Sequence, residues 1–161
     1  MPILSTKSII PENIQQGYDR LALRCSLNVQ ANAGVPSGGS LSVVGTRYRK
    51  PAPGEFDICG LVGHGEVGAN VEFGGPDTDL LVTLASLTAD YVGVNEWTTC
   101  SLNFAWRVEN GDLVGMAQAM CDEKSKAAGD TNELAATDPE FAKAFGQVLA
   151  ALHQFGVKQG W

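Results

Sequence analysis

His64 and Glu66 are the side chains whose types and spacing most directly suggest chemistry, because an H-x-E pair occurs in zinc sites that activate water. Those sites also need a P-C-x-x-C segment, which the sequence lacks. Only two histidines are present, His64 and His153, so one chain cannot build a three-histidine zinc site. We therefore predict no metal, no cofactor and no assigned catalytic residue. His64, Glu66 and Asp79 remain weak catalytic candidates, and a water-exposed polar turn is the simpler interpretation of residues 64–66.

The segment 63–68 also matches G-x-G-x-x-G, the pattern of dinucleotide-binding loops. That pattern holds a pyrophosphate only where it follows a buried strand and opens a helix. Residues 56–62 could supply the strand, but residues 67–73 alternate between apolar and polar or small side chains, which is the period of a strand. We therefore predict a turn or bulge at 63–65 between two strands, and no nucleotide binding.

The four cysteines stand at positions 25, 59, 100 and 121, and no two of them form a C-x-x-C pair. An even number could form two disulfides in a secreted protein. The N-terminal residues lack the charged leader and apolar core of a secretory signal, so we expect reduced thiols and a cytoplasmic location. The sequence also contains no G-x-S-x-G, no H-E-x-x-H and no phosphate-binding loop with its lysine.

Charge and hydropathy argue against two kinds of partner, nucleic acids and membranes. The chain has 11 Lys and Arg against 18 Asp and Glu, a net charge of -7, which disfavours binding to nucleic acid phosphates. No run approaches the ~18 apolar residues of a membrane-spanning helix. With 44% hydrophobic and 18% charged residues, the composition is that of a globular protein, and the length of 161 residues predicts a single domain over 1–161.

The elements that would position any site are mostly strands. Five apolar residues alternate with polar ones over 21–30, which predicts a half-buried strand. Further strands are expected at 41–48, 56–62 and 67–73, with a loop at 35–40. Two more, 97–108 and 113–121, flank Asn110-Gly111, a strong hairpin signal. Residues 122–137 show no clear period and are expected to be a polar connector.

Two helices are predicted, one in mid-chain and one near the C-terminus. Leucines and a tyrosine at helical spacing favour a helix over 77–92. Thr137-Asp138-Pro139-Glu140 resembles a capping box and begins a helix over 138–156. That helix carries one apolar stripe, which we expect to pack in the core; the stripe is Phe141, Phe145, Val148, Leu152 and Phe155.

The 110–111 turn fixes a register in which opposed residue numbers sum to 221. Phe104 then faces Ala117 and Leu102 faces Ala119, so bulky side chains meet small ones. In the same register Cys100 faces Cys121 as a non-hydrogen-bonded pair, the type with the closer side chains. We expect two neighbouring free thiols that can form a disulfide on oxidation.

These elements sum to an α+β fold: an antiparallel sheet of about six strands, with the option of curling toward a barrel, a helix over 77–92 and a capped helix over 138–156. No catalytic signature accompanies it. We therefore expect a non-enzymatic structural or assembly protein that acts as a homo-oligomer with copies of itself, and more specifically a virus or phage particle building block. Sheet edges and the apolar C-terminal helix are surfaces that copies could bury.

Two alternatives remain from the sequence. The helix 77–92 and the hairpin 97–121, with TTCSLNFAWRVENGDLVGMAQAM as the best part, resemble the helix and following strands of hot-dog acyl-thioester enzymes. That resemblance implies that Asp77, Asp79 or Asp90 supplies a catalytic carboxylate, although three earlier strands and a late helix depart from the family's usual order. The other alternative is a β-barrel that binds a small apolar ligand.

Overall fold

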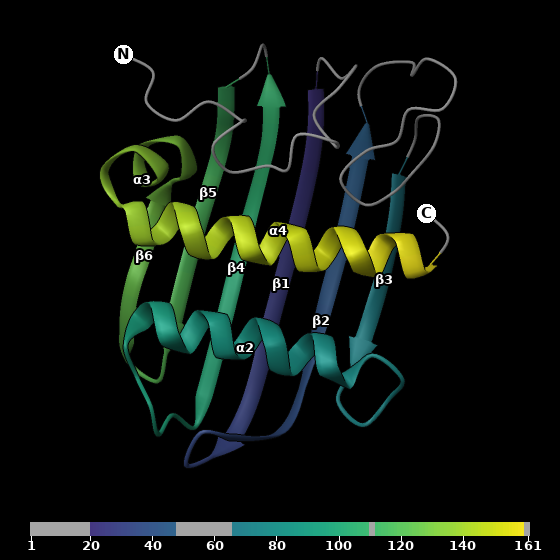
Figure 1. The fold of residues 1–161 in the computed structure, drawn as a ribbon. Helices are drawn as coiled ribbons and strands as arrows, with labels where there is room; N and C mark the ends of the chain where they lie inside the picture. Colours follow the sequence, from purple (N-terminus) through teal and green to yellow (C-terminus); the bar gives the residue numbers. More distant parts are fainter. Residues whose placement is uncertain (1–19, 48–65, 110–111, 160–161) are drawn as a thin grey trace.

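The computed structural model describes residues 20–47, 66–109 and 112–159, and these form one antiparallel sheet with helices on one of its faces (Figure 1). The sheet order is β3-β2-β1-β4-β5-β6. Its strands are β1 (Arg20–Asn32), β2 (Val35–Arg47), β3 (Glu66–Glu72), β4 (Thr99–Glu109), β5 (Asp112–Cys121) and β6 (Lys124–Asp130). The helices are α2 (Thr78–Val92), α3 (Thr131–Thr137) and α4 (Pro139–Gln159).

The predicted α+β fold with an antiparallel sheet is confirmed. The sheet is open, because β3 and β6 lie at its two edges and do not pair with each other. It therefore does not curl into a barrel within the described residues. In Figure 1, α2 and α4 run side by side across the strands and cover the same face of the sheet. The opposite face carries no described helix.

Alternation along the strands separates the two faces. In β1, Cys25, Leu27 and Val29 are buried under the helices, while Arg24 and Ser26 are exposed on the other face. The same period continues across the sheet, because each partner in the ladder shares the face of the residue it opposes. The core therefore lies between the sheet and the helix pair, where the α4 stripe is buried as expected.

The first hairpin differs from the sequence prediction, because residues 35–40 are strand and not loop. The turn is Ala33-Gly34, with φ of 50° and 83°, and both residues occupy the left-handed region. Pro36 is accommodated at a register shift in the β1–β2 ladder, where no regular hydrogen bond from its nitrogen is needed. Gly39, at φ 139°, pairs with Val29, and a Cβ there would lie 2.4 Å from the Asn28 carbonyl oxygen. The glycines that suggested a loop therefore allow a close strand approach.

The G-x-G-x-x-G segment continues as a strand, as predicted. Glu66 to Glu72 form β3, and no helix begins there. The strand is antiparallel to β2, with Val71 opposite Leu41. The expected strand 56–62 and the turn 63–65 lie outside the described residues, as does the hairpin tip 110–111.

The predicted helix 77–92 is present as Thr78–Val92 and ends at Gly93, whose φ of 86° is left-handed. At its start, Thr78 Oγ1 accepts a hydrogen bond from the Gly74 N–H and donates one to the Gly75 carbonyl. Asp77 makes no side-chain capping bond. The turn before α2 is thus fixed by the threonine hydroxyl and not by the aspartate.

The cap of the C-terminal helix is Asp138, so the capping-box prediction based on Thr137 and Glu140 is wrong in detail. Asp138 Oδ1 accepts hydrogen bonds from the Glu140 and Phe141 N–H groups, at 3.1 and 3.2 Å. Thr137 instead donates to the Glu133 carbonyl in the last turn of α3. The helix itself is confirmed and extends to Gln159.

Residues 122–137 are not a featureless connector. Lys124–Asp130 form the edge strand β6, in which Ala127 alone is buried, so little apolar alternation marks it in the sequence. Thr131–Thr137 form α3, and the Asp130 carboxylate caps it by accepting from the Glu133 N–H. The D-x-x-E spacing at 130–133 is the sequence signal that could have located this helix. Among the described helices, none has the length and apolar character to cross a membrane.

Candidate functional site

The structure does not assemble the weak catalytic candidates into a site. His64 lies outside the described residues, so its pairing with Glu66 is untested. Glu66 begins β3 and its backbone pairs with Thr46. Asp79 is exposed in the first turn of α2, which begins beyond the other end of β3. Glu66 and Asp79 are thus separated by the length of a strand, roughly 20 Å.

The carboxylates implied by the acyl-thioester resemblance are also dispersed. Asp77 forms an ion pair with Lys158 of α4, with 2.8 Å between Oδ1 and Nζ, and this partner raises the pKa of the lysine. Asp90 is exposed near the other end of α2. Within the described ranges, no three His, Cys, Asp or Glu side chains gather into a group that could hold a metal.

Cys100 and Cys121 face each other across β4 and β5, as the register predicted. Their Sγ atoms lie 3.4 Å apart and both side chains are buried against α2, where the Cys100 thiol is 3.5 Å from the Ala85 carbonyl oxygen. The hydrogen bond with Cys121 and burial raise the pKa of Cys100 far above its ordinary value. The same hydrogen bond lowers the pKa of Cys121. Cys25, Cys100 and Cys121 are free thiols.

The turn after Cys121 holds this pair in register. Asp122 adopts a φ of 54°, and its Oδ1 accepts hydrogen bonds from the Thr98 N–H and hydroxyl and from the Thr99 N–H, at 2.7 to 3.0 Å. These bonds lower the pKa of the exposed Asp122 carboxyl. The Asp122 N–H also donates to the Thr99 carbonyl, which leaves the next pair, Cys100 and Cys121, as the non-hydrogen-bonded type.

A polar cluster joins α2, α4 and β6. The Tyr91 hydroxyl donates to Asp138 Oδ2 at 2.6 Å, and Lys126 Nζ lies 4.6 Å from the centroid of the Tyr91 ring while it pairs with Glu140. Burial and the Asp138 carboxylate raise the pKa of Tyr91. Burial alone would raise the pKa of Asp138, but the hydrogen bonds from Tyr91 and the α4 N–H groups lower it below its usual value. These contacts join the start of α4 to α2 and to β6.

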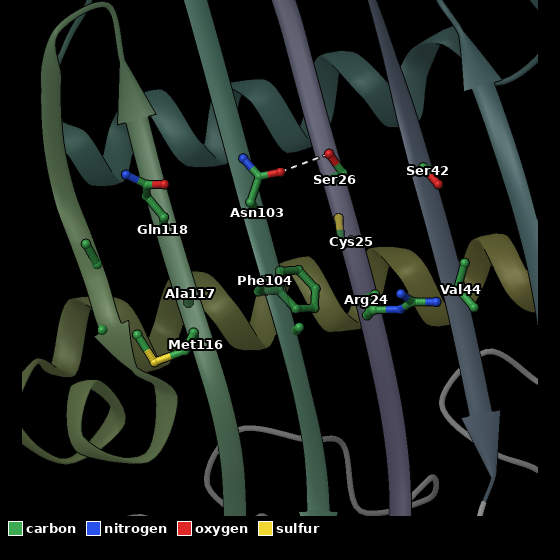
Figure 2. A pocket seen from close by; sticks show the side chains of 13 residues that line it. Arg24, Cys25, Ser26, Ser42, Val44, Asn103, Phe104, Met116, Ala117 and Gln118 are labelled. Carbon is green, nitrogen blue, oxygen red and sulfur yellow. Dashed lines mark hydrogen bonds between the residues drawn. The ribbon is translucent and has the colours of Figure 1, made fainter.

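A hollow of about 770 Å3 lies on the face of the sheet that no described helix covers, which we call the open face. Figure 2 shows Arg24 lying across its floor, with the guanidinium directed from β1 toward Val44 on β2. Uncharged polar side chains line the next row, where the Ser26 hydroxyl donates to Asn103 Oδ1 at 2.9 Å. Met116 borders the hollow and is 60% exposed.

The middle of this face carries few charges. From the Arg24–Val44 pair to the Gln30–Gly38 pair, its positions on β1, β2, β4 and β5 are mainly serine, asparagine, glutamine and small or apolar residues, and Arg24 is the charged one among them. Toward the end of the sheet the same alternation includes further charged residues, namely Arg20, Arg107, Glu109 and Asp112. On β3, Glu72 adds a carboxylate at the pair with Ser40, and Glu66 begins the strand at the same alternation. The sequence pattern marked Arg24 and Glu72 only as polar positions of half-buried strands. It does not show whether a second layer of helices covers the polar face.

Comparison with known proteins leaves the family open. No family model matches the chain, and no curated protein matches it. Among solved structures, the chain is similar to m157 from mouse cytomegalovirus, with 9% sequence identity and a TM-score of 0.38. That match covers 91% of this chain and 60% of m157, so the chain spans less than two thirds of the length of that protein.

Proposed function

We propose that this protein is a non-enzymatic structural or assembly protein, that it works as a homo-oligomer, and that the open face of its sheet contacts other copies. The more specific form of the proposal is a building block of a particle, such as that of a virus or phage. The observation that carries the proposal is the small number of charges in the middle of the open face, on a molecule of net charge -7.

Charge explains why such a face suits contact between identical chains. Two copies of a protein with 18 acidic and 11 basic residues repel each other in most orientations. The middle of the open face is a surface on which the approach of a second copy brings few like charges together. Depletion of charge is also the compositional mark of the central part of protein interfaces.

The size of the face supports the same proposal. Its described part spans six strands, roughly 24 Å from β3 to β6, and the length of β1 from Arg24 to Asn32, roughly 30 Å. The product, roughly 700 Å2 in projection, approaches the ~800 Å2 that each partner buries in a standard interface. Met116, Met120 and Val44 supply apolar area within it.

The C-terminal helix, which the sequence suggests as one surface that copies could bury, does not have that role in this proposal. Its apolar stripe is buried within the chain, with Phe145 2% and Leu152 1% exposed, so it does not offer a surface to partners. The sheet face replaces it.

The test is the solution mass of the full chain by light scattering over a range of concentrations. The wild type should form oligomers, and Gln118→Glu, which adds a charge to the open face, should weaken them. Gln147→Glu makes the same chemical change at an exposed position of α4 and should leave them unchanged. A wild type that stays monomeric at every concentration would refute the proposal, and so would equal effects of the two variants.

The hollow supports a second candidate function, binding of a small apolar ligand. Val44 and Met116 border it, and they offer apolar contacts. This candidate predicts a monomer that takes up an apolar fluorophore, and loss of that uptake when Ala105 on the floor of the hollow is replaced by Trp.

A further inference from the structure

Arg24 and Glu72 are opposite charges on the open face that do not meet within one chain. Arg24 pairs with Val44 and Glu72 pairs with Ser40, so the two residues are two strands and four positions apart. Strands lie about 4.8 Å apart and rise about 3.3 Å per residue, which places their Cα atoms roughly 16 Å from each other. Among the described residues, neither side chain has an ion-pair partner.

Covering this face would bury both charges. An ionised side chain that loses water without gaining an opposite charge is strongly destabilising. A second copy that covers the face must therefore place a carboxylate over Arg24 and a cation over Glu72. The second copy supplies both groups, a carboxylate in Glu72 and a cation in Arg24, at the same separation as in the first copy.

From this charge pattern we propose a two-fold symmetric dimer, in which Arg24 of each copy pairs with Glu72 of the other. The inference rests on the proposed function and specifies its interface. In a two-fold interface, if one residue contacts a second, the second contacts the first in return. One Arg24–Glu72 contact therefore implies a second, and both charges of both copies are neutralised. The competing arrangement, Arg24 against Arg24, would bring like charges together.

The register fixes where the symmetry axis lies. Ser42 pairs with Ser26 on β1 and with Asn70 on β3, so it stands midway between Arg24 and Glu72. If Arg24 of each copy lies over Glu72 of the other, the two-fold axis runs between the two facing sheets and passes over Ser42. On a flat sheet the strands of the two copies then cross at roughly 70°, nearer to the orthogonal class of sheet packing than to the aligned class.

The hollow beside Arg24 fits this arrangement. Sheets that pack face to face lie about 10 Å apart, so a carboxylate from the facing sheet must reach down to a guanidinium that lies along the floor. Small side chains on the neighbouring strands, among them Ala105 and Ser42, leave that space open. The Glu72 side chain of the second copy is the group we place there.

Charge reversal tests the pairing. Arg24→Glu and Glu72→Arg should each raise the dimer dissociation constant by more than ~30-fold, because each change breaks both ion pairs and leaves like charges opposed. Mixing the two variants should restore association, since the new glutamate of one faces the new arginine of the other, and their native charges also pair. Both positions are exposed, and circular dichroism checks that each variant stays folded.

The outcomes separate this inference from the proposed function. A monomeric wild type overturns both. Two results would overturn the Arg24–Glu72 pairing alone. In the first, the wild type is an oligomer and neither charge reversal changes its dissociation constant. In the second, mixing the two variants does not restore association. Either result leaves assembly through another surface.

A cross-link tests the axis independently. Ser42→Cys should be joined to its copy by a short cross-linker that reacts with two thiols. The two Cα atoms face each other across the axis at about 10 Å, which is too far for a direct disulfide. Gln118→Cys lies on the same face, but its two copies should be roughly 20 Å apart in the proposed dimer, from about 17 Å along the sheets and about 10 Å between them, so the same linker should not join them. The wild type, whose described cysteines are buried, supplies the background. Cross-linking at 118 without cross-linking at 42 would show that the axis lies elsewhere.

Discussion

The cross-strand thiol pair is the feature at the residue scale that sequence predicted most closely. The Asn110-Gly111 signal in the sequence predicted the register through Cys100 and Cys121, ten residues away in each direction, because a slip by one position would send every apolar side chain to the other face. The alternation of bulky and small residues across the pair of strands gave the same answer. The pairing of Tyr91 with Asp138 could not be predicted, since it depends on how two helices far apart in the sequence pack.

Oxidation with hydrogen peroxide should join Cys100 to Cys121. One thiolate reduces the peroxide to water and becomes a sulfenic acid; the second thiol then displaces its hydroxyl as water and forms the disulfide, so the protein loses two hydrogens and about 2 Da. The Sγ atoms, 3.4 Å apart, need only a small movement. Peptide mapping without reductant should find this bond, and Cys121→Ser should lack it. A bond from Cys100 to Cys25 or Cys59 in its place would contradict the register.

Asp138 should make stability depend on acid. Its pKa is lowered in the folded protein, so its contribution is present above the unfolded value of about 3.9 and is lost as the pH falls through the folded value. Asp138→Asn keeps a capping oxygen but loses the charge that strengthens the bond from Tyr91, so it should be less stable than the wild type by about 1 kcal/mol at pH 7, and the difference should shrink by pH 3. Chemical denaturation at the two pH values measures it. Asp90→Asn, at an exposed position of α2, is the control, and a difference that grows on acidification would be the wrong sign.

At the scale of elements, the long periodic segments were predictable and the short or glycine-rich ones were not. β1, α2, α4 and the β4–β5 hairpin have periods that local sequence reveals. The first half of β2 carries Pro36 and two glycines, and its pairing is decided by the neighbouring strand. β6 buries little and pairs because the turn at Asp122 returns the chain beside β5. In both cases tertiary contacts outweigh local preference.

Packing of α4 on the sheet should account for a large share of stability. Phe145 contacts Phe104 edge-on at 5.0 Å between ring centroids and stacks on Phe141 at 5.2 Å. Phe145→Ala and Leu152→Ala should each lower the free energy of unfolding by ~2–5 kcal/mol, because both leave a cavity in the core. Lys143→Ala, at an exposed position of the same helix, should change it by less than ~0.5 kcal/mol. Variants that unfold together with the wild type would mean that the stripe does not support the core.

At the scale of the whole molecule, two electrostatic effects act on self-association in opposite directions. The net charge of -7 repels copies over distances comparable with the Debye length, about 8 Å at physiological salt, and salt weakens this repulsion. The Arg24–Glu72 pairs of the proposed dimer attract, and salt weakens this attraction wherever water reaches the pairs. The effect of salt on self-association of the wild type is therefore the sum of two opposite effects, weaker repulsion and weaker attraction.

Removing the Arg24–Glu72 pairs should leave the repulsion between net charges as the electrostatic effect on self-association. In the double variant Arg24→Ala with Glu72→Ala, the two substitutions cancel in net charge, so the long-range repulsion is unchanged while the attraction is gone. Raising salt from about 20 to about 300 mM should then tighten association of the double variant, since only screening of repulsion remains. The wild type should associate more tightly than the double variant at low salt, and its advantage should shrink as salt rises. Sedimentation equilibrium across the salt series gives both dissociation constants. If the double variant and the wild type have the same dissociation constant at low salt, Arg24 and Glu72 do not attract each other across the interface, because screening is weakest there.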